Sequence, residues 1–266
     1  MRPGVIVPVH GFAPYLAEAL DTVLAQDPGA VVVVDDGSPD RLVLHPDHAP
    51  RVTLVRRDER GGPAVARATG LAALSADCDL IALCDADDAW EPGKLDAQLE
   101  ALERHAQAAA CFGRAIVVGP DDRPTGEDWA APAPGLHAAA AFARDLYAAN
   151  PIPTSSVVLR HECVERAGGF ECAVPVAEDW DLWLRIAAAG GDFVCEPQAL
   201  VRYRRHPGGL TADVAELATA QLALHEAHRG LASPDVRQRA VTADRKALKA
   251  ARRRARLGGR DPYRRR

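Results

Sequence analysis

Short runs of β-branched residues alternate with stretches of helical periodicity through the first half of the chain. Val5 to Val9 and Val31 to Val34 are two such runs, and the apolar residues between them recur on one helical face. Further runs at 52–55 and 80–84 are separated by residues 62–75, which read as a helix. Apolar strands that alternate with helices are typical of a sheet covered on both faces. We therefore expect an α/β fold with a mixed, mostly parallel sheet and a Rossmann-like nucleotide-binding half.

The second half is less regular, and its elements are harder to assign. The pattern predicts strands at 111–118, 155–159, 193–195 and 199–204, a long loop at 119–135 and a buried helix at 180–189. From residue 211 onward the sequence reads as helix, with a break near Ser233 and Pro234. The 266 residues are enough for one large domain. We expect that domain to span residues 1–209, followed by a C-terminal helical extension with a basic tail, residues 210–266.

Charge is divided unevenly along the chain. The net charge is −5, but residues 245–266 hold eleven basic residues and one acidic residue, which leaves about −15 for the body. Such an acidic body argues against nucleic acid as a partner. The basic tail is compatible with peripheral contact with an anionic membrane surface or an acidic partner, or with a solvated, fraying helix.

Neither the apolar runs nor the cysteines indicate a membrane-spanning or disulfide-bonded protein. No stretch approaches the roughly 18 uninterrupted apolar residues that a spanning helix needs. The six cysteines show no Cys-x-x-Cys spacing and lie mostly in apolar runs, as reduced core thiols would. We expect a cytoplasmic location, with peripheral attachment to the inner membrane face as an extension of that hypothesis.

Acidic residues follow two of the expected strands directly. Asp35 and Asp36 end the second strand before Gly37, where Asp36 could accept hydrogen bonds from a base or ribose, or form a turn with an Asx-type cap. After residue 84 comes Asp85-Ala86-Asp87-Asp88, three carboxylates in four positions. Their mutual repulsion favours a divalent cation, Mg²⁺ or Mn²⁺, although acids at a helix N-terminus would give the same pattern.

Two further segments carry groups that suit a binding crevice. Arg67 lies within a helix of small residues, where it could meet a diphosphate, support the acidic cluster or face solvent. Glu178 and Asp179 lead directly into an apolar helix that begins with Trp180. Carboxylates in that position either cap the helix or provide a general base in partly desolvated surroundings.

Taken together, four motifs in this order resemble the family 2 inverting glycosyltransferases, which have the GT-A fold. The motifs are Val5-Ile6-Val7-Pro8, Asp35-Asp36-Gly37-Ser38, Asp85-Ala86-Asp87-Asp88, and Glu178-Asp179 followed by Trp180-Asp181-Leu182-Trp183-Leu184-Arg185. Each is common alone, but their combination at this spacing is specific. The resemblance covers about residues 4 to 206 and leaves the C-terminal helices unexplained.

The resemblance implies a role for each matching residue. The donor nucleotide would be bound by Pro8, Val9, Asp36, Arg67, Asp85 and Ala86. Asp87 would bind the metal, and His206 lies where many relatives have a histidine that reaches the metal or the diphosphate; a surface imidazole is the alternative. Asp179 would be the general base that deprotonates the acceptor hydroxyl, and Glu178 would position the acceptor or its neighbours.

The implied activity is transfer of a sugar from a nucleotide diphosphate sugar, with a UDP-sugar favoured, to an acceptor hydroxyl. The reaction would be a single inverting displacement assisted by Mn²⁺ or Mg²⁺, in polysaccharide or glycoconjugate synthesis. The acceptor would be a carbohydrate, a lipid-linked molecule or a small molecule. Two alternatives remain: a sugar nucleotidyltransferase, although residues 9–13 lack a glycine-rich basic loop, and a related domain that binds a sugar nucleotide or a partner without turnover.

Overall fold

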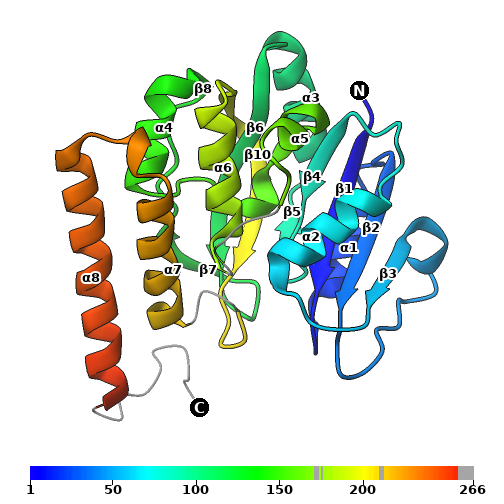
Figure 1. Cartoon of the computed structure of the whole chain (residues 1–266). Coiled ribbons are helices and arrows are strands. Elements are labelled where there is room, and N and C mark those ends of the chain that lie inside the picture. Colours follow the sequence, from blue (N-terminus) through cyan, green and yellow to red (C-terminus); the bar gives the residue numbers. More distant parts are fainter. Residues whose placement is uncertain (171–173, 175, 210–212, 257–266) are drawn as a thin grey trace.

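One mixed sheet runs through the part of the chain that the computed structural model describes, residues 1–170, 174, 176–209 and 213–256 (Figure 1). Its strands are β1 (Pro3–Val9), β2 (Ala30–Asp36), β3 (Thr53–Arg57), β4 (Leu80–Leu83), β5 (Ala89–Trp90), β6 (Ala108–Val118), β7 (Pro124–Asp128), β8 (Gly135–His137), β9 (Val158–Arg160) and β10 (Asp192–Arg204). Their order is β3-β2-β1-β4-β9-β6-β10-β5, with β7 paired to β6 and β8 to β10.

The sheet has a parallel half and a mixed half. Strands β3, β2, β1 and β4 are all parallel, so that the last residue of β1, Val9, lies opposite Asp35 near the end of β2. Strand β9 is antiparallel to both β4 and β6, and β10 then runs parallel to β6. The carboxyl ends of β1, β2 and β4 consequently meet at one edge, where a sheet of this type binds ligands.

Helices cover both faces because alternate residues of each strand point to opposite sides. The helices are α1 (Leu16–Leu24), α2 (Gly62–Ala73), α3 (Lys94–Arg104), α4 (Ala139–Ala148), α5 (His161–Arg166), α6 (Glu178–Ala188), α7 (Val214–Ala227) and α8 (Pro234–Arg256). Val5 and Val7 join the buried cluster beneath α1 and α3, whereas Ile6 joins the larger cluster on the opposite face. A Cβ on Gly70 of α2 would lie 2.4 Å from Ile6 Cγ2, so the glycine allows this helix to approach β1 closely.

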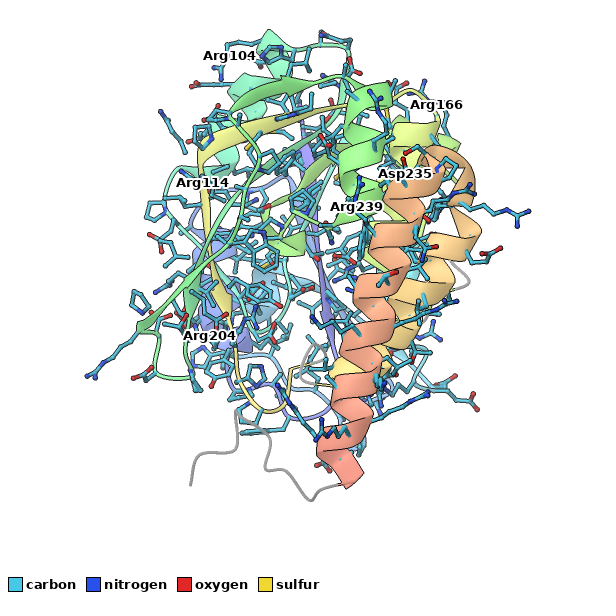
Figure 2. All side chains as sticks on the ribbon, turned by 90° about the vertical axis from the view of Figure 1, so that its left-hand side faces the viewer. Arg104, Arg114, Arg166, Arg204, Asp235 and Arg239 are labelled. Carbon is cyan, nitrogen blue, oxygen red and sulfur yellow. The ribbon has the colours of Figure 1, made fainter. Side chains whose placement is uncertain are left out.

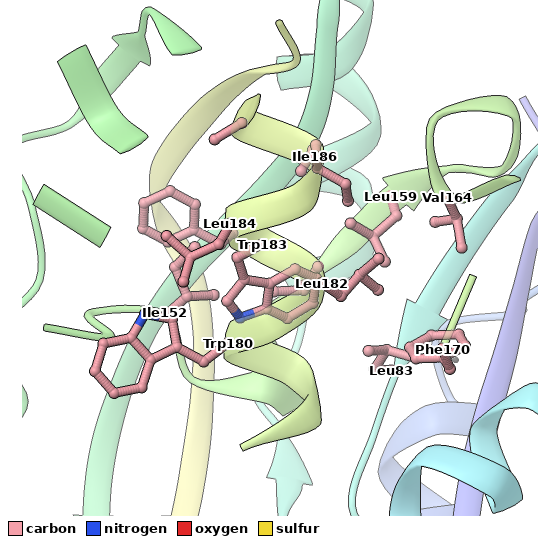
Figure 3. Packing of buried hydrophobic residues seen from close by; sticks show 14 of the residues in the cluster. Leu83, Ile152, Leu159, Val164, Phe170, Trp180, Leu182, Trp183, Leu184 and Ile186 are labelled. Carbon is pink, nitrogen blue, oxygen red and sulfur yellow. The ribbon is translucent and has the colours of Figure 1, made fainter. Parts of the chain in front are cut away.

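The larger cluster is built around α6, whose side chains are buried nearly all round (Figure 3). Leu182, Trp183 and Ile186 lie in it together with Leu159 of β9. The indole Nε1 of Trp180 donates to the carbonyl of Leu146 in α4 at 2.6 Å. This bond anchors the start of α6 against α4 and so helps to fix the position of the carboxylates that α6 carries.

The C-terminal helices pack outside this layer as an antiparallel pair (Figures 1 and 2). His225 of α7 is buried, and its ring nitrogens lie 2.7 Å from Asp244 Oδ2 of α8 and 2.8 Å from the carbonyl of Tyr147 in α4. His228 contacts Asp181 of α6 at 2.7 Å. The extension is therefore joined to the body by polar contacts as well as by apolar packing.

The fold class expected from the sequence is confirmed. The elements that differ from the expected ones lie in the second half of the chain. The two short strands expected at 193–195 and 199–204 are one strand, β10, with a register irregularity between Cys195 and Leu200. The expected loop at 119–135 contains β7, which folds back on β6. The strand expected at 155–159 begins instead with a 3₁₀ turn, Thr154–Ser156, before β9.

The cysteines of the described residues agree with the expectation of reduced core thiols. Cys78, Cys84, Cys111, Cys163 and Cys195 are buried and free. Cys172 lies outside the described residues, as does the basic tail beyond Arg256. None of the described helices is long and apolar enough to cross a membrane.

Candidate active site

A cavity of about 620 Å³ opens where the parallel strands end. Its wall combines the ends of β1 and β10 with the loop after β4 and the starts of α2, α6 and α7. All ten residues expected to form the site line it: Pro8, Val9, Asp36, Arg67, Asp85, Ala86, Asp87, Glu178, Asp179 and His206. These ten residues, which are up to 198 positions apart in the sequence, from Pro8 to His206, thus share one cavity.

Arg67 links the acidic cluster of β4 to the carboxylates of α6. Its side chain is buried, with 3% of the residue exposed; Nη2 donates to Asp85 Oδ1 at 2.5 Å and Nη1 donates to Glu178 Oε1. Burial disfavours the charged guanidinium, but Asp85, Glu178 and Asp179 outweigh this and raise the pKa of Arg67 above its usual value. Of the roles considered from the sequence, Arg67 supports the acidic cluster and is not a solvated side chain.

The same geometry perturbs the two carboxyl groups on either side of Arg67. Burial raises the pKa of Glu178 to about 7, against the opposing effect of the guanidinium. Burial also raises the pKa of Asp85, where Arg67 again opposes the shift and Asp87 adds to it. A buried carboxyl that titrates near neutrality beside a second carboxylate is typical of a functional site.

The loop after β4 is held by residues that the sequence did not single out for this purpose. Asp88 accepts from Ser155 Oγ at 2.6 Å and from the Arg204 amide at 2.9 Å. Ser155 Oγ in turn accepts from the Asp85 amide at 2.9 Å. Burial, reinforced by Asp87 and Asp85, raises the pKa of Asp88 well above its usual range. Asp88 therefore anchors the loop, and it does not cap a helix, because α3 begins only at Lys94.

Asp87 and His206 form the pair that a divalent cation would meet. His206 Nε2 lies 3.0 Å from Asp87 Oδ2, and both residues line the cavity. Carboxylate oxygens suit Mg²⁺ and Mn²⁺, which usually complete their coordination with water and substrate phosphates. The described residues contain no group of three His, Cys, Asp or Glu side chains placed to hold a metal. Asp87 and His206 could therefore supply part of the coordination shell of a cation, and water or a phosphate ligand would supply the remainder.

Asp179 occupies the first turn of α6 and faces the cavity. Its Oδ2 accepts from Thr154 Oγ1 at 2.6 Å and from Asn150 Nδ2 at 3.4 Å, while Oδ1 accepts from the Trp180 amide at 2.7 Å. The N-cap residue of α6, Ala177, lies two positions before Asp179 and has a left-handed backbone with φ of 76°, which is unusual for a residue other than glycine. This turn and the positive end of the helix dipole hold a carboxylate at the cavity wall.

Asp36 is a buried anchor on the opposite wall. Its carboxylate accepts from the amide of Gly62 at 2.7 Å and from that of Gly61 at 3.0 Å, and it pairs with Arg57 Nε at 2.8 Å. These contacts fix the start of α2 against the end of β2. Asp35 forms the Asx-type turn instead: its Oδ1 accepts from the Ser38 amide at 3.0 Å.

Helix α7 supplies a third wall that the sequence did not predict. Val214, Leu217 and Gln221 follow helical spacing along one side of α7, and all three line the cavity. Trp129 and Tyr203, whose ring centroids are 4.9 Å apart, line it as well. No local pattern marks the α7 residues as functional, because only the packing of α7 beside α6 brings them to the cavity.

The sequence of this chain is similar to a known family and to several known proteins. The family model described as Glycosyl transferase family 2 matches residues 4–160. An uncharacterized protein of Mycobacterium tuberculosis is 31% identical over 215 residues, which are 74% of this chain and 56% of that protein. Succinoglycan biosynthesis protein ExoW of Rhizobium meliloti is 36% identical over 123 residues, 43% of this chain and 38% of that protein. The chain spans about half the length, or less, of these relatives.

Solved structures share the fold at low sequence identity. A mannosyltransferase from Pyrobaculum calidifontis in complex with GDP-Man and Mn²⁺ gives a TM-score of 0.64 at 23% identity, covering 99% of this chain and 82% of that one. S. aureus TarS 1–349 in complex with UDP-GlcNAc gives a TM-score of 0.65 at 15% identity, covering 97% and 92%. TM-scores of 0.64 and 0.65 over almost the whole chain establish a common architecture of the GT-A type.

Proposed function

Because the chain belongs to glycosyl transferase family 2, we propose that it transfers a sugar from a nucleotide diphosphate donor to an acceptor hydroxyl with inversion at the anomeric carbon. The observation that carries the proposal is the single cavity in which Arg67 joins Asp85 to Glu178, beside Asp87 and Asp179. Donor-side and acceptor-side acids are thereby held in one fixed arrangement. Placing two reactants in one fixed geometry is a large source of rate enhancement.

The donor is best accommodated along the parallel strands. Pro8 and Val9 end β1, and Asp36, Asp85 and Ala86 follow at the neighbouring strand ends, so a nucleoside would lie across this edge. We favour a UDP-sugar. Since Asp36 already accepts from two backbone amides, it would shape the base-binding wall while retaining lone pairs for a ligand donor.

The leaving diphosphate requires positive charge nearby. Asp87 and His206 would hold Mn²⁺ or Mg²⁺, whose charge would offset the charge that develops on the diphosphate. Arg204 supports this side of the site, because its Nε donates to the carbonyl of Asp87 at 2.9 Å and its Nη2 contacts Glu18 at 2.8 Å. Its guanidinium also lies 4.4 Å from the centre of the Tyr15 ring.

Asp179 is the proposed general base. Its carboxylate takes the proton of the acceptor hydroxyl while the acceptor oxygen forms a bond to the anomeric carbon. The bond between that carbon and the diphosphate oxygen breaks, and its electron pair leaves with the nucleoside diphosphate. Thr154 and Asn150 orient the carboxylate, and Glu178 holds Arg67 in place on the neighbouring side.

The acceptor would enter between Asp179 and the wall of α7. Val214 and Leu217 give this wall an apolar character, and Gln221 adds an amide that can donate or accept. We propose that residues 210–266 form an extension to a catalytic domain of residues 1–209, and that the extension completes the acceptor side. A carbohydrate, a lipid-linked molecule or a small molecule remains admissible as the acceptor, in polysaccharide or glycoconjugate synthesis.

A thermal-shift panel tests the donor site first. The panel contains UDP, GDP, dTDP and CDP, each with and without Mn²⁺ or Mg²⁺, and compares the wild type with Asp87→Ala. A ligand at 100 times its Kd stabilises by about 2.7 kcal/mol, and we expect one nucleotide to give a metal-dependent shift that Asp87→Ala loses. Asp47→Ala, which alters an exposed carboxylate away from the cavity, should retain the shift.

The outcome also separates the proposal from its two alternatives. If no nucleotide shifts the midpoint in any condition, the donor assignment is wrong and a partner-binding role takes precedence. Binding without sugar transfer to any acceptor, and without donor hydrolysis, would indicate a non-catalytic domain. Release of pyrophosphate from a nucleoside triphosphate and a sugar phosphate would indicate a nucleotidyltransferase.

A further inference from the structure

The second half of α8 presents a basic face away from the body. Arg245, Lys249 and Arg252 recur at spacings of four and three residues, so they form one stripe, flanked by Lys246 and Arg253; all five are exposed. The residues that pack inward alternate with them: Ala240 and Asp244 are buried, and Ala247, Leu248 and Ala251 are half-buried. The helix is therefore amphipathic, with a basic outer face.

This charge contrasts with the remainder of the chain. Residues 245–256 contain seven basic and no acidic side chains, and the net charge of −5 minus these seven leaves −12 for the rest. An anionic surface would attract this helix and repel most of the body. Attachment would thus be confined to one end of the molecule and would have a defined orientation.

The basic end of α8 lies at the end of the molecule where the cavity opens. Helix α7 runs away from the cavity, which its first residues line, and α8 returns beside it in the opposite direction (Figure 1). In Figure 2, Arg239 lies in the upper part of α8, whereas the C-terminal half of the helix descends to the level of Arg204, a cavity residue. The basic stripe and the mouth of the cavity consequently share one end.

Exposed apolar side chains flank the same mouth. Phe12, in the loop after β1, is 93% exposed, and Val214, at the start of α7, is 44% exposed; both line the cavity. A phenylalanine with almost no protein contact leaves a large apolar surface in water, which transfer to an apolar phase would remove. Basic residues combined with exposed apolar residues match an interfacial membrane contact better than a soluble polyanion, which attracts the charges alone.

We propose that this end of the molecule, formed by the α8 stripe, Phe12 and Val214, docks on an anionic lipid bilayer with the cavity mouth facing the lipid headgroups. The stripe supplies electrostatic attraction, and Phe12 inserts into the interface. Vesicle binding requires neither donor nor catalysis, so it can fail while the proposed transfer reaction holds, and the reverse is equally possible.

Sedimentation of the 266-residue chain with vesicles tests the charge contribution. The wild type should bind vesicles containing phosphatidylglycerol at low salt, bind poorly to vesicles of phosphatidylcholine alone, and weaken as salt rises. Each basic residue near such a surface contributes about fivefold in affinity, so Arg245→Gln/Lys249→Gln/Arg252→Gln should bind roughly a hundredfold more weakly. The control Arg104→Gln/Arg114→Gln/Arg166→Gln removes the same charge away from α8 and should bind like the wild type (Figure 2).

A second pair of variants tests insertion. Phe12→Ser should weaken vesicle binding about tenfold or more, whereas Leu136→Ser, which alters a leucine of β8 that is 40% exposed, should not. Equal losses in the two triple variants would overturn the proposal, as would unaltered binding by Phe12→Ser. Inorganic polyphosphate serves as the competing probe. If it displaces the protein from vesicles and binds Phe12→Ser and the wild type equally, the stripe recognises a soluble polyanion and not a bilayer.

Discussion

The parallel strands and the region around α6 and α7 contribute to the same cavity in different ways. On the strand side, Asp36 ends β2, and the amides of Gly61 and Gly62 fix its carboxylate. On the helix side, Asp179 is held mainly by side chains from the loop before β9, Thr154 and Asn150. The position of Asp36 is thus set by neighbouring backbone, whereas that of Asp179 depends on how α6 packs against distant segments.

This difference suggests a division of labour between binding and chemistry. A wall built from strand ends would suit the proposed nucleotide donor, and a wall built from packed helices would suit the proposed acceptor. Arg67 is the connection between the two, because it contacts Asp85 on one wall and Glu178 on the other. Variants in each wall should therefore affect different measured quantities.

The largest expected effect comes from Asp179→Asn on the helix side. Removing a positioned general base lowers turnover by about 10² to 10⁴, while the nucleotide-induced thermal shift should be retained. Steady-state transfer assays together with the thermal shift measure the two quantities. Near-normal turnover would refute the assignment, and a lost nucleotide shift would place Asp179 on the donor wall.

Arg67→Met should break the connection between the walls. The substitution leaves the buried Glu178 and the partly buried Asp85 without their shared cation, which costs about 3–5 kcal/mol in the free energy of unfolding at neutral pH. Urea denaturation measures this loss. Arg104→Met, which removes an exposed ion pair with Glu196, should cost less than about 1 kcal/mol. Equal losses in the two variants would contradict a special role for Arg67.

The pH dependence of stability should report on Glu178 at this connection. Its pKa is raised from 4.5 to about 7 on folding, so between these values the folded chain binds a proton that the unfolded chain has released. Stability should therefore fall as the pH rises from about 4.5 to 7, by at most about 1.4 kcal/mol per pH unit from this group.

Urea denaturation between pH 5 and 8 tests that dependence. Glu178→Gln cannot titrate, so it should flatten the slope in this window. The raised pKa of Asp85 acts in the same direction, and a residual slope in the variant would measure its share. The lowered pKa values of Asp35 and Asp181 act only in acid, since their stabilising effect is lost as the pH falls below about 3.8. An unchanged slope in Glu178→Gln would contradict the assignment.

The smallest effect is expected on the wall of α7. Leu217→Ala should raise the acceptor KM about tenfold, because it removes part of an apolar wall, and the nucleotide-induced thermal shift should not change. Thr219→Ala, on an exposed side of the same helix, should leave both quantities unaltered. A change in the nucleotide shift with Leu217→Ala would mean that α7 belongs to the donor wall.

The sequence predicted the strand side better than the helix side. The elements of the first half match the expected strands and helices closely, because continuous apolar runs and helical periodicity are local properties. In the second half, the sequence pattern predicts two short strands where the structure has the single strand β10. Pro197 and the exposed Gln198 interrupt the apolar pattern of that strand. Helices α4 and α5 were not predicted, because an alanine-rich segment and a six-residue helix carry little periodicity.

The candidate site also has residues that the sequence predicts and residues that it does not. Its ten predicted residues all line the cavity. Three of them, Asp36, Asp85 and Asp87, do so because acids placed at strand ends lie at the carboxyl edge of a parallel sheet, and the others were assigned their roles through the family resemblance. Ser155, Thr154 and Arg204 were not predicted to hold those acids. Hydroxyl groups in a turn and an arginine in a strand are ordinary in sequence, and their partners lie between 25 and 117 residues away.

The sequence by itself determined the layered sheet, its binding edge and the acidic residues along it, since each follows from the spacing of neighbouring residues. Only the tertiary structure decided that one arginine joins the loop after β4 to α6, that Asp88 anchors its loop, and that α7 adds a wall to the cavity. Those contacts depend on which faces of distant elements bury one another, and the free energy of that burial is set by packing across the whole domain. Local spacing carries no information about it.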